Sequence, residues 1–370
     1  MRIRSMVVIA AAAVAAAGVG SGSASDGAKP PGLEFLGQAI VPTGTTFAAT
    51  TVGGLSSITF DRAREVFYSV SDDQSVLNPA RFYTLRLDLS DGHLDNGDVE
   101  FLGTTTLLAP DGQPYAPASL DPEGLTLAKS GELILTSEGI ATRGIAPWVR
   151  RYALDGTFLG GLPVPDAFQP TSSTHGVRLN LGFEAAAVAP NGRHLFVGSE
   201  GALVQDGPAA TVAGGSPSRI LRYNLASGRL DDQYVYVTDP VAEPPVPASA
   251  FTVNGLVELL PFNDQFMLSM ERSFSVGAPG TGNTIKLYSV AFPGADDVDG
   301  VDSLAGLLGN LRPVDKTLLL DLRTLGLPLD NVEGMTIGPT LPDGRRSLVL
   351  VSDNNFAPSQ FTQFLLFALD

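Results

Sequence analysis

Acidic residues recur at two positions of a pattern that repeats along the chain, and its clearest copy is residues 182–201. In that copy Glu184 opens one apolar run and Glu200 closes the next, and an Asn-Gly dipeptide at 191–192 joins the two runs. Such a dipeptide between apolar runs is typical of a tight β-hairpin. Because the start of one antiparallel strand lies beside the end of the next, the two carboxylates should lie close together. Carboxylates held close repel unless a cation, a proton or water intervenes.

Five copies of this pattern can be aligned on their first apolar run. The opening position holds Ser56, Glu123, Glu184, Gly255 and Glu333, and the closing position holds Asp72, Glu138, Glu200, Glu271 and Asp353. We therefore predict eight carboxylate ligands for a metal ion: Asp72, Glu123, Glu138, Glu184, Glu200, Glu271, Glu333 and Asp353. Calcium is the first choice because it prefers several oxygen ligands, and magnesium is the second. The alternative is that these acids are solvated loop ends or structural hydrogen-bond acceptors.

Catalytic and substrate-binding roles can be assigned to a few of these residues and their neighbours. A carboxylate such as Glu184 or Glu333 could orient a water molecule as general base. Guanidinium groups match phosphate, so we expect substrate contacts from Arg178 and Arg272, although Arg272 could instead pair with a nearby carboxylate. Further candidate substrate contacts are Asn180, Asn354 and His175, the last being a lone loop histidine of a kind that is usually solvated.

The elements that must position these residues are short strands bounded by Gly, Pro, Asn or Asp. Regularly repeated units of three or four such strands predict an all-β fold, a β-propeller with five apparent four-stranded blades. The segments 208–247 and 291–313 are each long enough to hold a sixth blade. The last copy lacks a fourth strand, and the segment 34–41 resembles the fourth strand of the first copy. We therefore expect the N-terminal strand to complete the last blade and close the ring, which protects the sheet edges. A pair of β-sandwiches or an open array is the alternative.

The composition limits the function classes. The formal net charge of −16 argues against nucleic acid or an anionic membrane as partner, since both require basic patches. An anionic small-molecule ester remains a candidate substrate, provided that a metal ion or arginines offset the charge. The chain has no cysteine, which excludes disulfides, zinc–thiolate sites and cysteine nucleophiles. We expect a monomer.

The first 25 residues have the features of a secretory signal peptide. Arg2 and Arg4 precede an apolar, alanine-rich run over residues 6–19, and small residues follow at 22–25. We therefore expect an exported protein, periplasmic or extracellular, in which residues 26–370 form a single domain. A retained N-terminal membrane anchor is the alternative.

Four parts of the chain combine glutamate and glycine with apolar runs: DPEGLTL, RLNLGFEAAAV, LSMERSF with GNTIKLY after it, and NVEGMTI with LVLVSDNNF after it. These segments resemble the bacterial phytase-like domain family, also described as the esterase-like activity of phytase family. The resemblance covers roughly residues 35–370 and implies a secreted β-propeller with phosphoesterase or esterase activity. The positions that it matches are Glu123, Gly124, Asn180, Glu184, Glu271, Arg272, Asn331, Glu333, Gly334, Asp353 and Asn354. The chain departs from the usual pattern at Ala185, where a glycine is expected.

Three functions follow from these observations. The first is a metal-dependent hydrolase of phosphate esters, with phytate-like substrates included, that acts at an acidic channel mouth. The second is a non-catalytic propeller that binds a ligand and is stabilised by calcium. The third is a lactonase or carboxylic-ester hydrolase. The sequence does not decide whether the protein is an enzyme.

Overall fold

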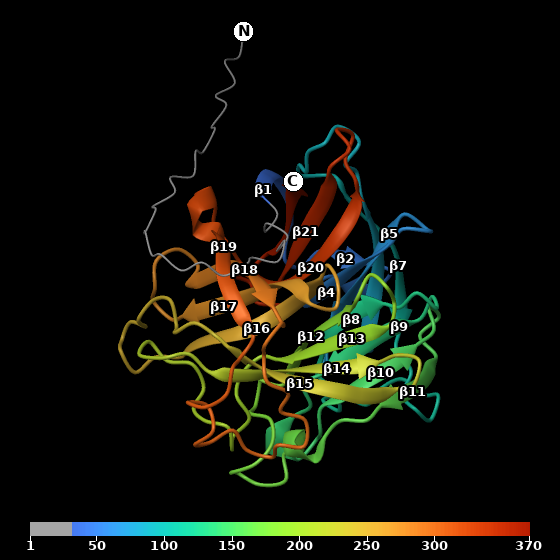
Figure 1. Cartoon of the computed structure of the whole chain (residues 1–370). Helices are drawn as coiled ribbons and strands as arrows, with labels where there is room; N and C mark the ends of the chain where they lie inside the picture. The colour runs from blue at the N-terminus through green and yellow to red at the C-terminus, as the bar shows by residue number, and fades with distance from the viewer. Residues whose placement is uncertain (1–31) are drawn as a thin grey trace. The chain divides into compact units, whose positions relative to one another are not determined.

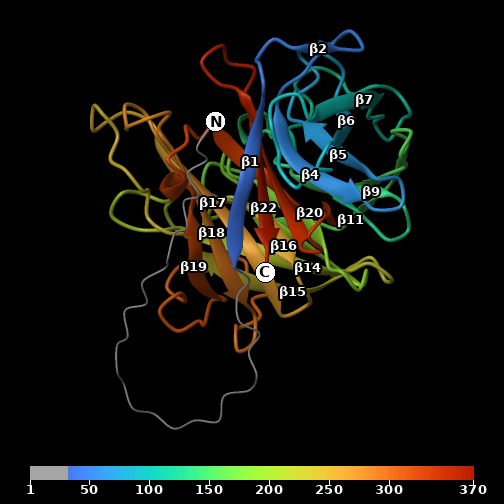
Figure 2. The same cartoon turned by 90° about the horizontal axis from the view of Figure 1, so that it is seen from above.

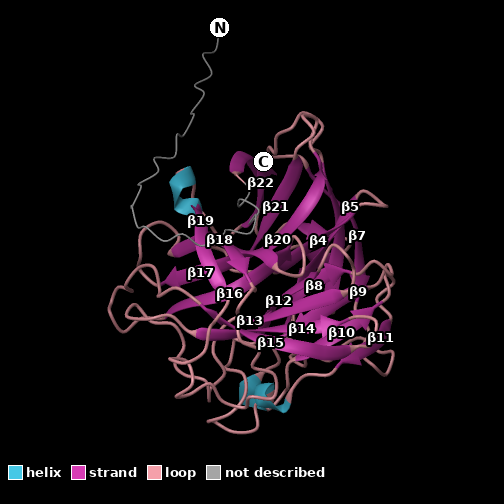
Figure 3. Cartoon of the chain, in the orientation of Figure 1, coloured by secondary structure: helices cyan, strands magenta, loops and turns pink. Residues whose placement is uncertain are grey.

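The apolar runs of residues 32–370, which are the part of the chain that the computed structural model describes, form antiparallel sheets of four strands each (Figure 1). Five such sheets make a β-propeller, as predicted. The helical segments are short 3₁₀ turns, so the described part is almost entirely strand and loop (Figure 3). None of its helices has the length and apolarity needed to cross a membrane. The predicted signal peptide, residues 1–25, lies outside the described residues.

The five blades follow one another along the chain, each running from an inner strand to an outer strand. The first has β4 (Leu55–Asp61), β5 (Val66–Ser71), β6 (Arg81–Leu87) and β7 (Val99–Thr106). The second has β8 (Pro122–Leu127), β9 (Leu133–Ser137), β10 (Trp148–Tyr152) and β11 (Phe158–Leu162). The third has β12 (Phe183–Val188), β13 (His194–Ser199), β14 (Pro217–Asn224) and β15 (Arg229–Val237). The fourth has β16 (Thr252–Pro261), β17 (Phe266–Ser275), β18 (Asn283–Ala291) and β19 (Asp315–Asp321). The fifth has β20 (Asn331–Thr340), β21 (Arg346–Asp353), β22 (Thr362–Leu369) and β1 (Leu33–Val41).

The N-terminal strand closes the ring as the sequence predicts. Strand β1 pairs antiparallel with β22, from Leu33 opposite Leu369 to Val41 opposite Thr362 (Figure 2). The described residues contain no sixth four-stranded sheet. Residues 208–247 supply two strands of the third blade with the loops around them, and residues 292–313 form the connection between β18 and β19.

The core consists of apolar clusters between neighbouring blades, one at each of the five interfaces. Along the second strand of a blade, successive residues belong alternately to the clusters on its two sides. In β21, Leu348 and Leu350 pack toward the fourth blade, whereas Val349 and Val351 pack toward the first. Successive side chains of a strand point to opposite faces of the sheet, and in a propeller both faces are covered. This is why the second strands are almost continuously apolar.

Candidate functional site

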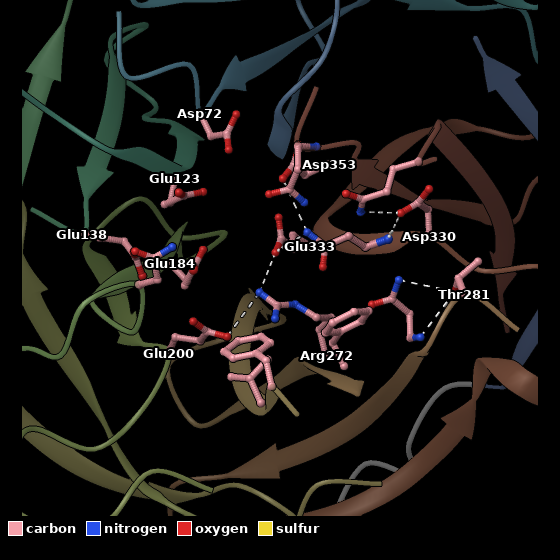
Figure 4. Close-up of a pocket in the computed structure, with 18 of the residues that line it drawn as sticks. Asp72, Glu123, Glu138, Glu184, Glu200, Arg272, Thr281, Asp330, Glu333 and Asp353 are labelled. Atoms are coloured by element: carbon pink, nitrogen blue, oxygen red, sulfur yellow. Dashed lines mark hydrogen bonds and ion pairs between the residues drawn. The ribbon is translucent and has the colours of Figure 1, made fainter. Parts of the chain in front are cut away.

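A cavity of about 860 Å³ is lined by residues from all five blades, and acids dominate its lining (Figure 4). The acidic residues around it are Asp72, Asp121, Glu123, Glu138, Glu184, Glu200, Asp330, Glu333 and Asp353. Seven of the eight carboxylates predicted from the sequence are therefore brought together around one cavity.

A β-bulge near the start of every inner strand explains how the opening residues reach the cavity. In each blade the regular pairing between the first and second strand shifts near the start of the first strand. The residues at these bulges are Ser56, Glu123, Glu184, Val257 and Glu333. A bulge bends its strand and re-aims a side chain, and bulges are common next to active sites. The three bulge glutamates all line the cavity.

The residue after the bulge is small in the first, second, third and fifth blades, whereas in the fourth blade it is a glutamate. These residues are Ser57, Gly124, Ala185, Glu258 and Gly334. The buried carboxylate of Glu258 reaches across to the first blade, where its Oε2 accepts a hydrogen bond from Ser57 Oγ at 2.9 Å. A Cβ on Gly334 would lie 2.9 Å from the Ser57 backbone, so the inner strands approach closely here. The small side chain of Ala185 suits the same crowded position.

The fourth blade differs from the register that the sequence suggests. On the second strand of each blade, one residue pairs with the first-strand residue just before the bulge. In the first, second, third and fifth blades this residue is a buried serine, namely Ser71, Ser137, Ser199 and Ser352. In the fourth blade Glu271 takes this place, opposite Leu256. The position that follows, which holds an acid elsewhere, is occupied by Arg272. Likewise Val257, and not Gly255, is the bulge residue.

Glu271 consequently lies outside the cavity, in a polar cluster on the side of the third blade. Its carboxylate accepts hydrogen bonds from Tyr236 Oη at 2.8 Å and from Asn254 Nδ2 at 2.9 Å, and it pairs with Lys316. These partners satisfy the carboxylate without a metal ion. Gly255 has a packing role, because a Cβ there would lie 2.1 Å from Cγ of Glu200.

Arg272 is the only basic residue among the described residues that line the cavity. Its Nη2 lies 2.7 Å from Glu333 Oε1, to which it donates a hydrogen bond, and 3.3 Å from Glu200 Oε1. Asn331 Nδ2 donates to the same oxygen of Glu333 at 2.9 Å. Of the two roles considered for Arg272, internal pairing is the one present in the structure.

Two groups of three carboxylates are close enough to hold a metal ion. In each group, one oxygen from every residue lies within 4.8 Å of the others. The first group is Asp121, Glu123 and Glu138, and the second is Glu138, Glu184 and Glu200. Glu138 belongs to both groups, and its Oε1 also accepts a hydrogen bond from the Gly182 N–H at 2.8 Å.

The charge of these carboxylates is poorly compensated within the protein. Burial, together with the neighbouring carboxylates, raises the pKa of Asp72 to about 8. Burial raises the pKa of Glu200 to about 7 although Arg272 opposes the shift, and it raises that of Asp121 to about 6. The same causes hold the pKa values of further carboxyls well above their usual range, those of Glu123, Glu138, Glu184 and Asp353. Protons or cations must therefore stabilise this cluster.

The residues fit a hard divalent cation. Within residues 32–370, Oδ1 of Asp72 is a buried oxygen of the cavity lining that has no hydrogen-bond donor. Oε1 of Glu200 also lacks a hydrogen bond, although it lies 3.3 Å from Arg272 Nη2. A buried oxygen without a partner is costly, and a cation would satisfy it. The nearby ligand atoms are all carboxylate oxygens, which suit calcium or magnesium and not softer metals.

The residues predicted to contact substrate are divided between the cavity and other places. Asn180 lines the cavity together with Arg272. Arg178 is bound to backbone carbonyls, those of Ala202 and Gly207. His175 lies 3.0 Å from Asp302 in a surface loop. Asn354 is buried, and its Oδ1 accepts hydrogen bonds from two backbone N–H groups.

Other lining residues were missed by the sequence reasoning. Asp121 and Asp330 each precede an inner strand closely, so an acid just before the bulge glutamate is a usable signal. The serine–acid dipeptide that ends four second strands would have revealed the register of the fourth blade. Nothing in the sequence marks Phe251, in the segment before β16, or Phe274, on β17, as lining residues.

The fold and the site define a five-bladed β-propeller with an acidic cavity where its inner strands begin. The chain belongs to the phytase-like family, described as "Esterase-like activity of phytase", whose model matches residues 50–356. No curated protein sequence is significantly similar to the chain.

Solved structures similar to the chain include three bacterial enzymes. The endo-arabinase of Bacteroides thetaiotaomicron is 12% identical, with 90% of this chain and 96% of that chain covered and a TM-score of 0.43. The endo-1,4-beta-xylanase of the same organism is 10% identical, with 85% and 90% covered and a TM-score of 0.44. The periplasmic gluconolactonase of Pseudomonas aeruginosa is 15% identical, with 86% of each chain covered and a TM-score of 0.36. Similarity at this level carries no argument about activity.

Proposed function

We propose that this protein is an exported, metal-dependent hydrolase of phosphate monoesters, with calcium as the metal and magnesium as the second choice. The observation that carries the proposal is the pair of carboxylate groups that share Glu138, beside the buried Oδ1 of Asp72, which lacks a hydrogen-bond donor. Membership of a family described by an esterase-like activity supports hydrolysis.

The metal would be held by the two groups, with Glu138 common to both. When bound, a divalent cation supplies Lewis-acid polarisation of a phosphoryl oxygen and positive charge for an anionic ester. Without that charge the cavity would repel such a substrate, since nine carboxyl groups and one guanidinium line it.

Glu333 is the residue that we assign as general base. Arg272 and Asn331 both donate to its Oε1, which fixes its orientation and leaves Oε2 free of these two contacts. The Arg272 charge also opposes the rise that burial causes in the pKa of Glu333. A carboxylate so held can accept a proton from water as the water oxygen attacks phosphorus. The P–O bond to the alcohol then breaks, the leaving alkoxide takes a proton from solvent water, and Glu333 releases the proton that it accepted back to solvent.

Glu184 is assigned to metal binding and not to proton transfer. It belongs to one of the two carboxylate groups. Burial and four neighbouring carboxyls hold its pKa well above the usual range, so it needs a cation to be ionised near neutral pH.

The experiment is phosphate release from phenyl phosphate and from glycerol phosphate by the purified protein, in calcium, in magnesium and in EDTA. Turnover that requires a divalent cation is the expected result. Absence of turnover of these two esters and of phytate by folded, calcium-loaded protein would contradict the proposed phosphomonoester hydrolysis.

A carboxylic-ester or lactone hydrolase is the second candidate. One observation favours it. Arg272 is already paired with carboxylates, so the lining described for this cavity offers no free basic side chain to an anionic substrate. Phenyl acetate and a simple lactone, assayed beside the phosphate esters, distinguish the two candidates. A purely binding propeller would show calcium-dependent stabilisation and no turnover of either class.

A further inference from the structure

One part of the cavity lining is uncharged and carries two phenylalanines. Phe251 precedes β16, Val253 lies on β16 and Phe274 lies on β17, while Thr281 and Asn283 come from the hairpin that leads into β18. These residues all belong to the fourth blade or to the segment just before it, and Thr281 is visible on the side of Arg272 in Figure 4. The cavity therefore joins an acidic part to an apolar, uncharged part.

The two aromatic rings form a wall that is held in place. Their centroids lie 6.2 Å apart, with an angle of 39° between the ring planes. Phe274 packs on Gly282, where a Cβ would lie 2.9 Å from the ring. The Val276 N–H donates to the Phe251 carbonyl at 3.0 Å, which ties the segment before β16 to the end of β17.

Phe251 is nevertheless 65% exposed, so its ring contributes little to the core. A single exposed apolar residue is ordinary on a protein surface. An exposed ring beside a second ring, in the lining of a cavity that also holds the candidate metal ligands, is suited to contact with an apolar group of a ligand.

The charges of the cavity disfavour a substrate with many phosphates. Arg272 is the only basic residue that the described lining contains, and Glu200 and Glu333 already neutralise it. A polyphosphorylated inositol such as phytate would place its further phosphates away from the two carboxylate groups that would hold a metal, beside other carboxylates or the phenylalanine rings. A substrate with one phosphate on an apolar alcohol meets neither conflict.

We propose that the ester this cavity takes is a monoester of an apolar, ring-bearing alcohol, whose leaving group lies against Phe251 and Phe274. This inference rests on the proposed function for the placement of the phosphoryl group at the acidic part. It goes beyond that function by naming the leaving group and by disfavouring phytate.

Binding of non-hydrolysable phosphonates tests the inference independently of turnover. Phenylphosphonate and methylphosphonate are titrated calorimetrically into the calcium-loaded full-length protein, with phytate as a third probe. We expect phenylphosphonate to bind about tenfold more tightly than methylphosphonate, the factor given by burying roughly 55 Å² of apolar surface. The Phe251→Ala variant should lose most of this preference and keep its affinity for methylphosphonate. Leu159→Ala, which removes an exposed apolar side chain on the outer strand β11, should change neither affinity.

The outcomes separate this inference from the proposed function. Turnover of phosphate esters without a preference for the phenyl compound would overturn the inference and leave the function standing. If the protein prefers the phenyl compound through Phe251 but does not turn over phosphate esters, the contact with the aromatic rings is supported and the proposed hydrolase function is contradicted. Tighter binding of phytate than of phenylphosphonate would overturn the inference, as would an unchanged preference in both Phe251→Ala and Phe274→Ala.

Discussion

Arg272 and Glu333 are joined by a hydrogen bond of 2.7 Å that links the fourth blade to the fifth beside the acidic cavity. The same guanidinium lies 3.3 Å from Glu200 of the third blade. One arginine thus holds together carboxylates from two blades that are not neighbours in the ring. The predictions below begin from this arrangement.

Replacing Arg272 by Gln should destabilise the metal-free protein by about 3 kcal/mol at pH 8, because breaking a buried ion pair leaves its partner uncompensated. The loss should be smaller at pH 5, where the carboxyls hold protons. Urea unfolding in EDTA at the two pH values measures it. Arg86→Gln is the matched control, since its partner Glu100 is exposed and such pairs contribute little. Equal losses in the two variants would contradict the structural role of Arg272.

The stability of the metal-free protein should fall as the pH rises from 5 to 8. Burial raises the pKa of Glu200 from 4.5 to about 7 and that of Asp72 to about 8, so the folded protein keeps protons that the unfolded chain has released. A carboxyl with a raised folded-state pKa stabilises below its unfolded pKa, and that contribution is lost as the pH passes the folded value. For Glu200 alone the loss is on the order of 3 kcal/mol.

Calcium should remove part of this pH dependence, because a cation replaces the protons in the cavity. Part of the pH dependence should remain in calcium. Burial also raises the pKa of Glu258 to about 8, and this residue is not among those lining the acidic cavity. Urea unfolding over pH 5 to 8, in EDTA and in calcium, gives both slopes. Stability that rises with pH in EDTA would contradict the uncompensated state of the carboxylates.

Glu138→Gln should abolish the calcium-induced rise in melting temperature, since Glu138 is common to both carboxylate groups. In the wild type we expect a rise of about 3 °C or more under saturating calcium. The contrasting variant is Glu271→Gln, which removes a predicted ligand that lies outside the cavity. It should lower the melting temperature in EDTA and leave the calcium-induced rise intact. If Glu271→Gln abolishes the rise and Glu138→Gln does not, the assigned metal position is wrong.

Glu333→Gln should lower kcat by about 100-fold or more, the usual contribution of a general base, and leave calcium-dependent stabilisation in place. Glu184→Gln should reduce both, because Glu184 is assigned to the metal. Steady-state kinetics and thermal unfolding on the same two preparations separate the roles. Restored activity of Glu184→Gln at high calcium would agree with a ligand, whereas loss of calcium stabilisation in Glu333→Gln would reverse the assignment.

The fold could be predicted from the sequence because its signals are local and repeated. Each blade has Gly, Pro, Asn or Asp between short apolar runs, and strand β1, which completes the fifth blade, resembles β7, the fourth strand of the first blade. The same repeat correctly predicted that seven carboxylates lie around one cavity. The prediction was wrong for Glu271, because the fourth blade has this acid where the other blades have a serine, and Arg272 where they have an acid. An alignment on the acid is therefore out of register by one residue.

The contacts outside the repeat could not be predicted. Whether a loop residue such as His175 or Arg178 reaches the cavity depends on how the long connections between strands fold. The periodic pattern of the strands does not predict this. Phe251 illustrates the opposite case, in which the segment between two blades brings an apolar ring to the cavity. These positions are set by tertiary contacts such as the hydrogen bond between Val276 and Phe251.

The pairing of β1 with β22 has a consequence for the order in which the cavity is assembled. Leu33 lies opposite Leu369, so the fifth blade is incomplete until almost the whole described chain is available. The two groups of three carboxylates come from the second and third blades, whereas Arg272 and Glu333 come from the fourth and the fifth. A chain that is still being synthesised therefore lacks the complete cavity, and the contact between Arg272 and Glu333 forms only as folding ends.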